Sequence, residues 1–95
     1  MFVIDHAKQQ IKSRFGKNSK QIIRTLEASH YKAVTSEDWL VYKLGRMYNL
    51  KDGSNGDCLV VVVKGSAVMT VFLRRKEQLD GHGRNGRTQK IVWAG

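Results

Sequence analysis

Near the middle of the chain stands the run Cys58-Leu59-Val60-Val61-Val62-Val63, which is apolar at every position and rich in β-branched residues. A strand with one solvated face alternates apolar and polar residues, whereas a strand covered on both faces is apolar throughout. Gly65-Ser66 follows the run and suits a two-residue hairpin turn of type II′, since glycine adopts the positive φ that this turn needs. We therefore predict a central strand at residues 58–63, paired antiparallel with a partner at residues 67–73.

The partner strand should present two different faces, because successive side chains of a strand point to opposite sides. By this alternation one face carries Val68, Thr70, Phe72 and Arg74, and the other carries Ala67, Met69, Val71, Leu73 and Arg75. Another strand is predicted around residues 39–44. Residues 51–57, between it and the central strand, are rich in Gly and Asp and are typical of a turn or loop.

Two helices are predicted before these strands. A short strand at residues 2–4 leads to Asp5, a favourable N-cap residue, and Gly16 suits the position just past the end of the first helix. The second helix, capped by Asn18 or Ser19, has an apolar stripe that should face the core, formed by Ile22, Ile23 and Leu26.

These elements predict an α+β fold with the order β-α-α-β-β-β, in which two helices pack on an antiparallel sheet. The 95 residues suffice for one small core. We place the α+β domain at residues 1–76 and a basic, Gly-rich arm with a short C-terminal strand at residues 77–95. Residues 91–93 have enough apolar surface for an edge strand or for docking on a partner.

The charge balance indicates a polyanionic partner. Seventeen Lys and Arg residues stand against eight Asp and Glu, so the formal net charge is +9. Nucleic acid, and RNA in particular, is the first candidate partner. A membrane-surface role is disfavoured, because no long amphipathic helix sets Lys opposite Trp and Phe.

Other classes of protein fit the sequence poorly. No apolar run approaches the roughly 18 residues that span a bilayer, and residues 1–4 are too short for a secretory signal, so we expect a cytoplasmic protein. The single cysteine, Cys58, is expected to be a buried structural thiol. His6, His30 and His82 are far apart in sequence and have no metal-ligand spacing, so neither a metal nor another cofactor is predicted.

A polar row on the first helix is the strongest candidate for chemistry. A helix turns about 100° per residue, so His6, Gln10 and Arg14 follow one row. The neighbouring row is apolar and consists of Ala7, Ile11 and Phe15. The polar row should therefore border whatever the helix packs on, where a histidine is partly desolvated yet reachable by a ligand.

The motif His6-Ala7-x-x-Gln10-x-x-x-Arg14-Phe15, with the later strand Met69-Thr70-Val71-Phe72, resembles the small RelE-like families of the barnase–EndoU–colicin–RelE ribonuclease superfamily. The resemblance covers residues 2 to about 76 and is greatest to a branch whose first helix reads His-Ala-x-x-Arg-x-x-x-Arg. It implies an RNA-binding cleft framed by the sheet and the first helix, and metal-independent cleavage by attack of the 2′-hydroxyl. It also implies that His6, Arg14, Thr70 and Arg74 form the catalytic site. Gln10 departs from the pattern, because it stands where an Arg would hold phosphate.

The same four residues suit this reaction chemically. Cleavage through the 2′-hydroxyl needs a base, an acid and cations that stabilise the charged phosphorane. His6 could exchange the proton, Arg14 and Arg74 could each donate to two phosphate oxygens, and Thr70 could donate one further hydrogen bond. A second titrating group could be His30, Tyr31 or Glu37.

Further basic residues are predicted to bind nucleic acid, several of them in the Gly-rich arm. They are Lys12, Lys17, Arg75, Lys76, Arg84, Arg87 and Lys90. The expected partner is RNA, either free or on the ribosome, and a toxin-like ribonuclease would also need an acidic antitoxin. Two alternatives stay open: a non-catalytic nucleic-acid-binding protein on the same scaffold, and a small phage-type inhibitor of an acidic host protein.

Overall fold

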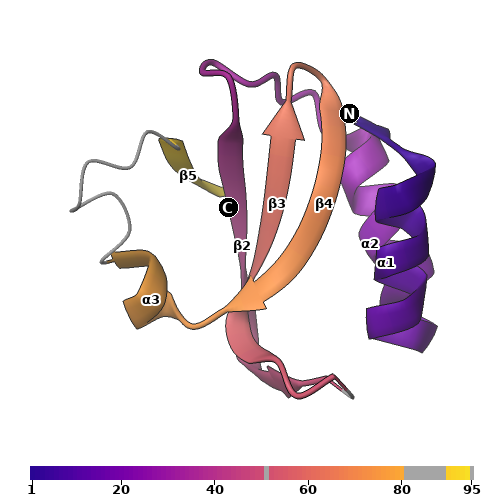
Figure 1. The fold of residues 1–95 in the computed structure, drawn as a ribbon, viewed down its shortest axis with the longest axis vertical. Coiled ribbons are helices and arrows are strands. Elements are labelled where there is room, and N and C mark those ends of the chain that lie inside the picture. Colours follow the sequence, from indigo (N-terminus) through magenta and orange to yellow (C-terminus); the bar gives the residue numbers. More distant parts are fainter. Residues whose placement is uncertain (51, 81–89, 95) are drawn as a thin grey trace.

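A computed structural model describes residues 1–50, 52–80 and 90–94 as five strands and three α-helices (Figure 1). In chain order these are β1 (Phe2–Val3), α1 (Asp5–Phe15), the 3-10 turn η1 (Gly16–Asn18), α2 (Ser19–Ala28), β2 (Asp38–Asn49), β3 (Asn55–Lys64), β4 (Ala67–Arg74), α3 (Lys76–Asp80) and β5 (Lys90–Ala94). They form one sheet with the strand order β1-β4-β3-β2-β5. The pairs β2–β3 and β3–β4 are antiparallel, whereas β1 is parallel to β4 and β5 is parallel to β2.

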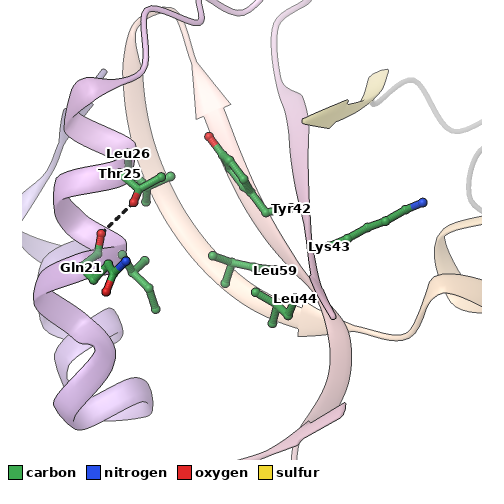
Figure 2. A pocket seen from close by; sticks show the side chains of 8 residues that line it. Gln21, Thr25, Leu26, Tyr42, Lys43, Leu44 and Leu59 are labelled. Carbon is green, nitrogen blue, oxygen red and sulfur yellow. Dashed lines mark hydrogen bonds between the residues drawn. The ribbon is translucent and has the colours of Figure 1, made fainter. Parts of the chain in front are cut away.

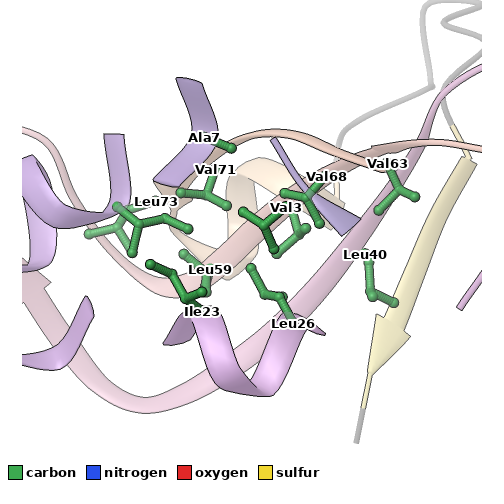
Figure 3. Packing of buried hydrophobic residues seen from close by; sticks show 12 residues of the cluster. Val3, Ala7, Ile23, Leu26, Leu40, Leu59, Val63, Val68, Val71 and Leu73 are labelled. Carbon is green, nitrogen blue, oxygen red and sulfur yellow. The ribbon is translucent and has the colours of Figure 1, made fainter. Parts of the chain in front are cut away.

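Both long helices lie on the same face of the sheet, to its right in Figure 1, and this confirms the α+β prediction. The prediction of an antiparallel sheet is wrong for its two edges, because β1 and β5 each pair in parallel with their neighbours. Between the helices and the sheet lies the main core, shown in Figure 3. Its buried members are Val3, Ala7, Ile11, Ile23, Leu26, Leu40, Leu59, Val61, Val63, Val68, Val71 and Leu73. The stripe predicted on α2 is correct for Ile23 and Leu26, while Ile22 is only partly buried.

The opposite face of the sheet is covered by α3. Leu79 of this short helix packs with Val41, Cys58 and Val60 in a second apolar cluster. Trp39, Phe72 and Ile91 surround that cluster. The central strand β3 is therefore covered on both faces, which explains why the run from Cys58 to Val63 is apolar throughout.

The helix ends agree in part with the sequence. Gly16 has φ +51° at the end of α1, a conformation in which glycine carries no steric penalty. Asp5 was predicted to be the N-cap of α1 but is its first helical residue. Ile4 occupies the cap position, without a side-chain hydrogen bond. The extended strand β1 runs straight into the helix, so the boundary falls at Ile4 and the Asp5 carboxylate lies in the first turn, where a negative charge is favourable.

A bulge in β4 overturns the predicted alternation of faces. The partner of Val62 is Thr70, but that of Val63 is Val68, so Met69 is an extra residue in β4. An extra residue shifts the side-chain alternation by one position. Val68 therefore joins Val71 and Leu73 in the main core instead of sharing a face with Thr70 (Figure 3).

The C-terminal residues extend the sheet. Ile91-Val92-Trp93 lies within β5, which forms the edge of the sheet beside β2, so of the two predicted roles the edge strand is the one adopted. The sheet thus includes residues on both sides of the boundary predicted at residue 76. The central part of the Gly-rich arm, with Arg84 and Arg87, lies outside the described residues. Among the helices described, none is long and apolar enough to cross a membrane.

Candidate functional site

The polar row of α1 lies against β4. Thr70 Oγ1 donates a hydrogen bond to Gln10 Oε1, although the two residues are 60 positions apart. One turn further along the helix, the Arg14 guanidinium donates to the carbonyl oxygen of Val71 at 2.7 Å. Among the described residues, β1 pairs only with the first two residues of β4, Ala67 and Val68. The next part of β4 therefore lies free of β1, and α1 contacts it there. We call this junction, formed by His6, Gln10, Arg14, Thr70 and Val71, the α1–β4 edge.

His6 is the exposed member of the α1–β4 edge. It lies one helical turn before Gln10 on the same row, so its side chain is placed beside the Gln10–Thr70 contact. The imidazole makes no hydrogen bond or ion pair with the described residues. It is therefore accessible to a ligand, as predicted, but it is more exposed than the partly desolvated histidine that the sequence analysis expected.

Arg14 is more constrained than the sequence indicated. Besides its bond to Val71, its Nε lies 3.8 Å from Asp52 Oδ2, in the turn between β2 and β3. Hydrogen bonds from the Ser54 hydroxyl and amide, with a smaller contribution from Arg14, lower the pKa of the Asp52 carboxyl, which keeps it negative. Part of the Arg14 charge is thus already balanced by a carboxylate.

Replacing Arg14 by alanine should destabilise the fold. A hydrogen bond from a charged donor to a partly buried carbonyl contributes about 1–2 kcal/mol, and the alanine variant would leave the Val71 carbonyl without it. Urea unfolding measures the loss. Lys12→Ala is the matched control, because it removes the same charge from an exposed position of α1. Equal midpoints for the two variants would contradict the structural role of Arg14.

The other predicted catalytic residue, Arg74, is engaged elsewhere. Its guanidinium carbon lies 4.4 Å from the centre of the Phe72 ring, and its Nη1 donates to the Leu73 carbonyl at 2.9 Å. It follows Thr70 by four residues, or about 13 Å of strand. The structure therefore brings Thr70 to α1 but places Arg74 near the start of α3.

Among the described residues, none of the predicted second titrating groups forms a hydrogen bond or ion pair with α1. Tyr31 donates its hydroxyl hydrogen bond to Asp38, and burial, with the bond and charge of Asp38, raises the pKa of Tyr31 to about 12. Glu37 Oε2 accepts from the Trp39 indole at 3.3 Å. His30 is exposed just after α2. His6 is therefore the titrating side chain that the described structure places at the α1–β4 edge.

The predicted nucleic-acid-binding residues that the structure describes are all exposed: Lys12, Lys17, Arg75, Lys76 and Lys90. Arg75 lies 3.8 Å from Glu77, which balances part of its charge. Two cations that the sequence analysis did not single out, Lys43 and Arg46, line a pocket together with Lys76. Gly45 between them was the available signal, since a glycine inside a strand pattern often marks a bulge.

An apolar cleft of about 210 Å³ separates α2 from β2 (Figure 2). Its walls are formed mainly by Ile22, Leu26, Tyr42, Leu44 and Leu59. Burial raises the pKa of Tyr42, so its hydroxyl stays protonated near neutral pH. Figure 2 also shows that the Lys43 side chain leaves β2 on the side away from α2. The cleft therefore offers little charge for a phosphate.

No protein-family model, curated protein sequence or solved structure matches this chain. Within the described residues, no group of three or more His, Cys, Asp or Glu side chains is placed to hold a metal ion.

Proposed function

We propose that this protein is a small, RelE-like endoribonuclease that cleaves RNA at the α1–β4 edge without a metal. The observation that carries the proposal is the contact between Gln10 and Thr70, with the nearby bond from Arg14 to Val71. These contacts bring the polar row of α1 to the strand edge and leave His6 exposed beside it. The net charge of +9 favours an RNA substrate.

In the proposed reaction, the 2′-oxygen of a ribose attacks the adjacent phosphorus, and the bond from phosphorus to the 5′-oxygen breaks. The products are a 2′,3′-cyclic phosphate and a 5′-hydroxyl. His6 takes the proton from the 2′-hydroxyl, and the same proton can be returned to the leaving oxygen. Arg14 donates hydrogen bonds to the phosphoryl oxygens as negative charge develops there, and Thr70 exchanges its bond to Gln10 for one to a phosphoryl oxygen.

Replacing His6 by alanine should abolish cleavage and leave RNA affinity within a few fold, because the proton-transfer group is lost and no cation of the binding surface changes. Purified wild type and variant are incubated with total cellular RNA in EDTA and analysed on a denaturing gel. Gln9→Ala, an exposed neighbour on α1 outside the polar row, is the control and should cleave like the wild type. Cleavage by the His6 variant would rule out the assignment. Intact RNA in every lane, followed by intact messenger RNA on translating ribosomes, would rule out the ribonuclease itself.

A second candidate is a non-catalytic RNA-binding protein on the same scaffold. Two features favour it: Asp52 balances part of the Arg14 charge, and the uncharged Gln10 stands where the RelE-like motif that the chain resembles has an Arg. Such a protein would retain RNA without cleaving it, and the affinity would fall with salt with a log-log slope of about −0.7 per phosphate contact on a single strand. Retention without that slope would favour an acidic protein partner, such as an antitoxin or a host protein.

A further inference from the structure

A pocket of about 280 Å³ opens on the face of the sheet that carries α3, opposite α1 and α2. Three basic side chains line it, and Asp57 is the acidic residue among its lining. We call the site formed by Lys43, Arg46 and Lys76 the cationic pocket. We propose that the cationic pocket binds a phosphodiester group of single-stranded RNA, away from the α1–β4 edge. This inference rests on the proposed RNA substrate but does not depend on cleavage.

The register of the sheet explains how the cations gather. Lys43 pairs with Cys58, and Cys58 pairs with Arg74 on its other side. Neighbouring strands lie about 4.8 Å apart, so basic residues flank the buried Cys58 on both sides. Lys76 enters from the start of α3, directly after β4.

An irregularity in β2 supplies the third cation. The pairing of β2 with β3 is interrupted between Lys43 and Tyr48, and Gly45 within this interval has φ +78°. Such a conformation is easy for glycine and strained for other residues. In a regular strand, residues three positions apart point to opposite faces. The interruption lets Arg46 line the pocket beside Lys43 all the same.

The cations of the pocket lack carboxylate partners among the described residues. Lys43 lies over the Trp93 ring, with Nζ 5.6 Å from its centre, and the Arg46 guanidinium lies 4.8 Å from the centre of the Tyr48 ring. Asp57 is already used, because it accepts a hydrogen bond from the Lys76 amide at 3.1 Å and another from the Cys58 thiol. Three positive charges against one negative charge leave an excess that an anion would balance.

The chemistry of these side chains favours a phosphodiester over a carboxylate. An Arg fork can bind two phosphate oxygens together, and lysines act as point charges on the same group. Trp93, whose ring lies beneath the Lys43 ammonium, is 42% exposed and could stack on a base whose phosphate occupies the pocket. The combination of cations with an exposed aromatic ring is typical of sites for single-stranded nucleic acid.

The test compares two double variants that each remove two positive charges. Lys43→Ala/Arg46→Ala removes two of the three cations of the pocket, whereas Lys20→Ala/Arg24→Ala removes two exposed cations of α2. The probe is a fluorescent 12-nucleotide single strand with 2′-O-methyl riboses, which cannot be cleaved through the 2′-hydroxyl. We expect the pocket variant to bind at least tenfold more weakly and to lose about 1.4 from the magnitude of its salt slope, while the α2 variant changes less than twofold.

Equal weakening by the two double variants would overturn the proposal, because it would show that total charge and not the pocket governs binding. Inorganic phosphate is tested as a competitor: competition only at millimolar levels supports a phosphodiester ligand, and micromolar binding of phosphate that RNA does not displace would overturn it. Circular dichroism and urea unfolding show whether each variant is folded. Trp93→Ala, which keeps every charge, is an independent test, and its affinity for the probe is expected to fall severalfold. Because the probe cannot be cleaved, a negative result in the ribonuclease assay does not affect the probe-binding test. A negative result in the probe-binding test likewise does not affect the ribonuclease assay.

Discussion

Replacing Asp38 by alanine is expected to lower the stability of the protein by about 3 kcal/mol and its melting temperature by about 15 °C. The side chain is fully buried, and its carboxylate accepts four hydrogen bonds. They come from the Tyr31 hydroxyl, the Val34 amide at 2.8 Å, and both the amide, at 3.1 Å, and the hydroxyl of Thr35. The alanine variant would leave these donors without their acceptor and would release the chain between α2 and β2.

The Asp38 contribution should also depend on pH. Burial alone would raise the pKa of the carboxyl, but the hydrogen bonds from Thr35, Tyr31 and the two amides outweigh burial and hold the pKa far below its ordinary value. A carboxyl with a lowered pKa in the folded state stabilises the protein above its unfolded pKa of about 4, and this contribution is lost as the pH falls further. The difference between wild type and Asp38→Asn should therefore be constant above about pH 5 and shrink below pH 4.

Tyr31 provides the matched control for the Asp38 prediction. Its pKa is raised from 10.0 to about 12, so its proton stabilises the fold below pH 10 and this contribution is lost as the pH rises towards 12. Tyr31→Phe removes one of the four donors and should cost about 1 kcal/mol near neutral pH. This difference from the wild type should shrink below pH 4, because the Tyr31 hydrogen bond is one of those that lower the Asp38 pKa. Thermal unfolding of the wild type and of the Asp38→Ala, Asp38→Asn and Tyr31→Phe variants at several pH values checks both predictions. A stable Asp38→Ala variant would show that the carboxylate does not hold this segment.

Local sequence signals predicted most of the secondary structure. The β-branched run identified the central strand because burial on both faces permits no polar residue there. Gly16 and Gly65 marked the end of α1 and the hairpin turn, and both have positive φ. These features depend on neighbouring residues, so a sequence can reveal them directly.

Contacts between distant segments could not be predicted in the same way. The parallel pairing of β1 with β4 and of β5 with β2 joins segments that are remote in sequence, and the five-residue helix α3 has too short a pattern to identify. The bulge at Met69 was missed because it depends on how β4 fits against β3. Each of these features is set by tertiary packing and not by local propensity.

At the candidate site, too, the features set by local sequence were predictable and those set by contacts between distant segments were not. The helical spacing of His6, Gln10 and Arg14 correctly predicted a polar row at the border of the packed face, as the Gln10–Thr70 contact confirms. The Arg14–Asp52 pair was not predictable, because it depends on where the turn between β2 and β3 lies. The cationic pocket was missed since its residues come from β2 and the start of α3, and only Gly45 hinted at the irregularity.

Gly56 is the position where β3 approaches the backbone of β4 most tightly among the described glycines. A Cβ atom there would lie 2.5 Å from the Arg74 carbonyl oxygen and 2.7 Å from the Arg74 backbone nitrogen. The obstacle is backbone, so no side-chain rotation can relieve it. Arg74 comes two residues before Lys76, and the displaced backbone would therefore alter the cationic pocket.

Replacing Gly56 by alanine should accordingly cost about 2–3 kcal/mol and weaken binding of the uncleavable RNA probe, although no charge is changed. The control is Gly53→Ala in the nearby turn, where a Cβ meets no atom within 4 Å but φ is +87°. That variant should lose only about 1 kcal/mol, from backbone strain, and should bind the probe normally. Urea unfolding and probe titration of both variants separate the two causes. Loss of stability with unchanged RNA affinity at Gly56 would show that the pocket tolerates displacement of Arg74, and equal stability of the two variants would disprove the close approach itself.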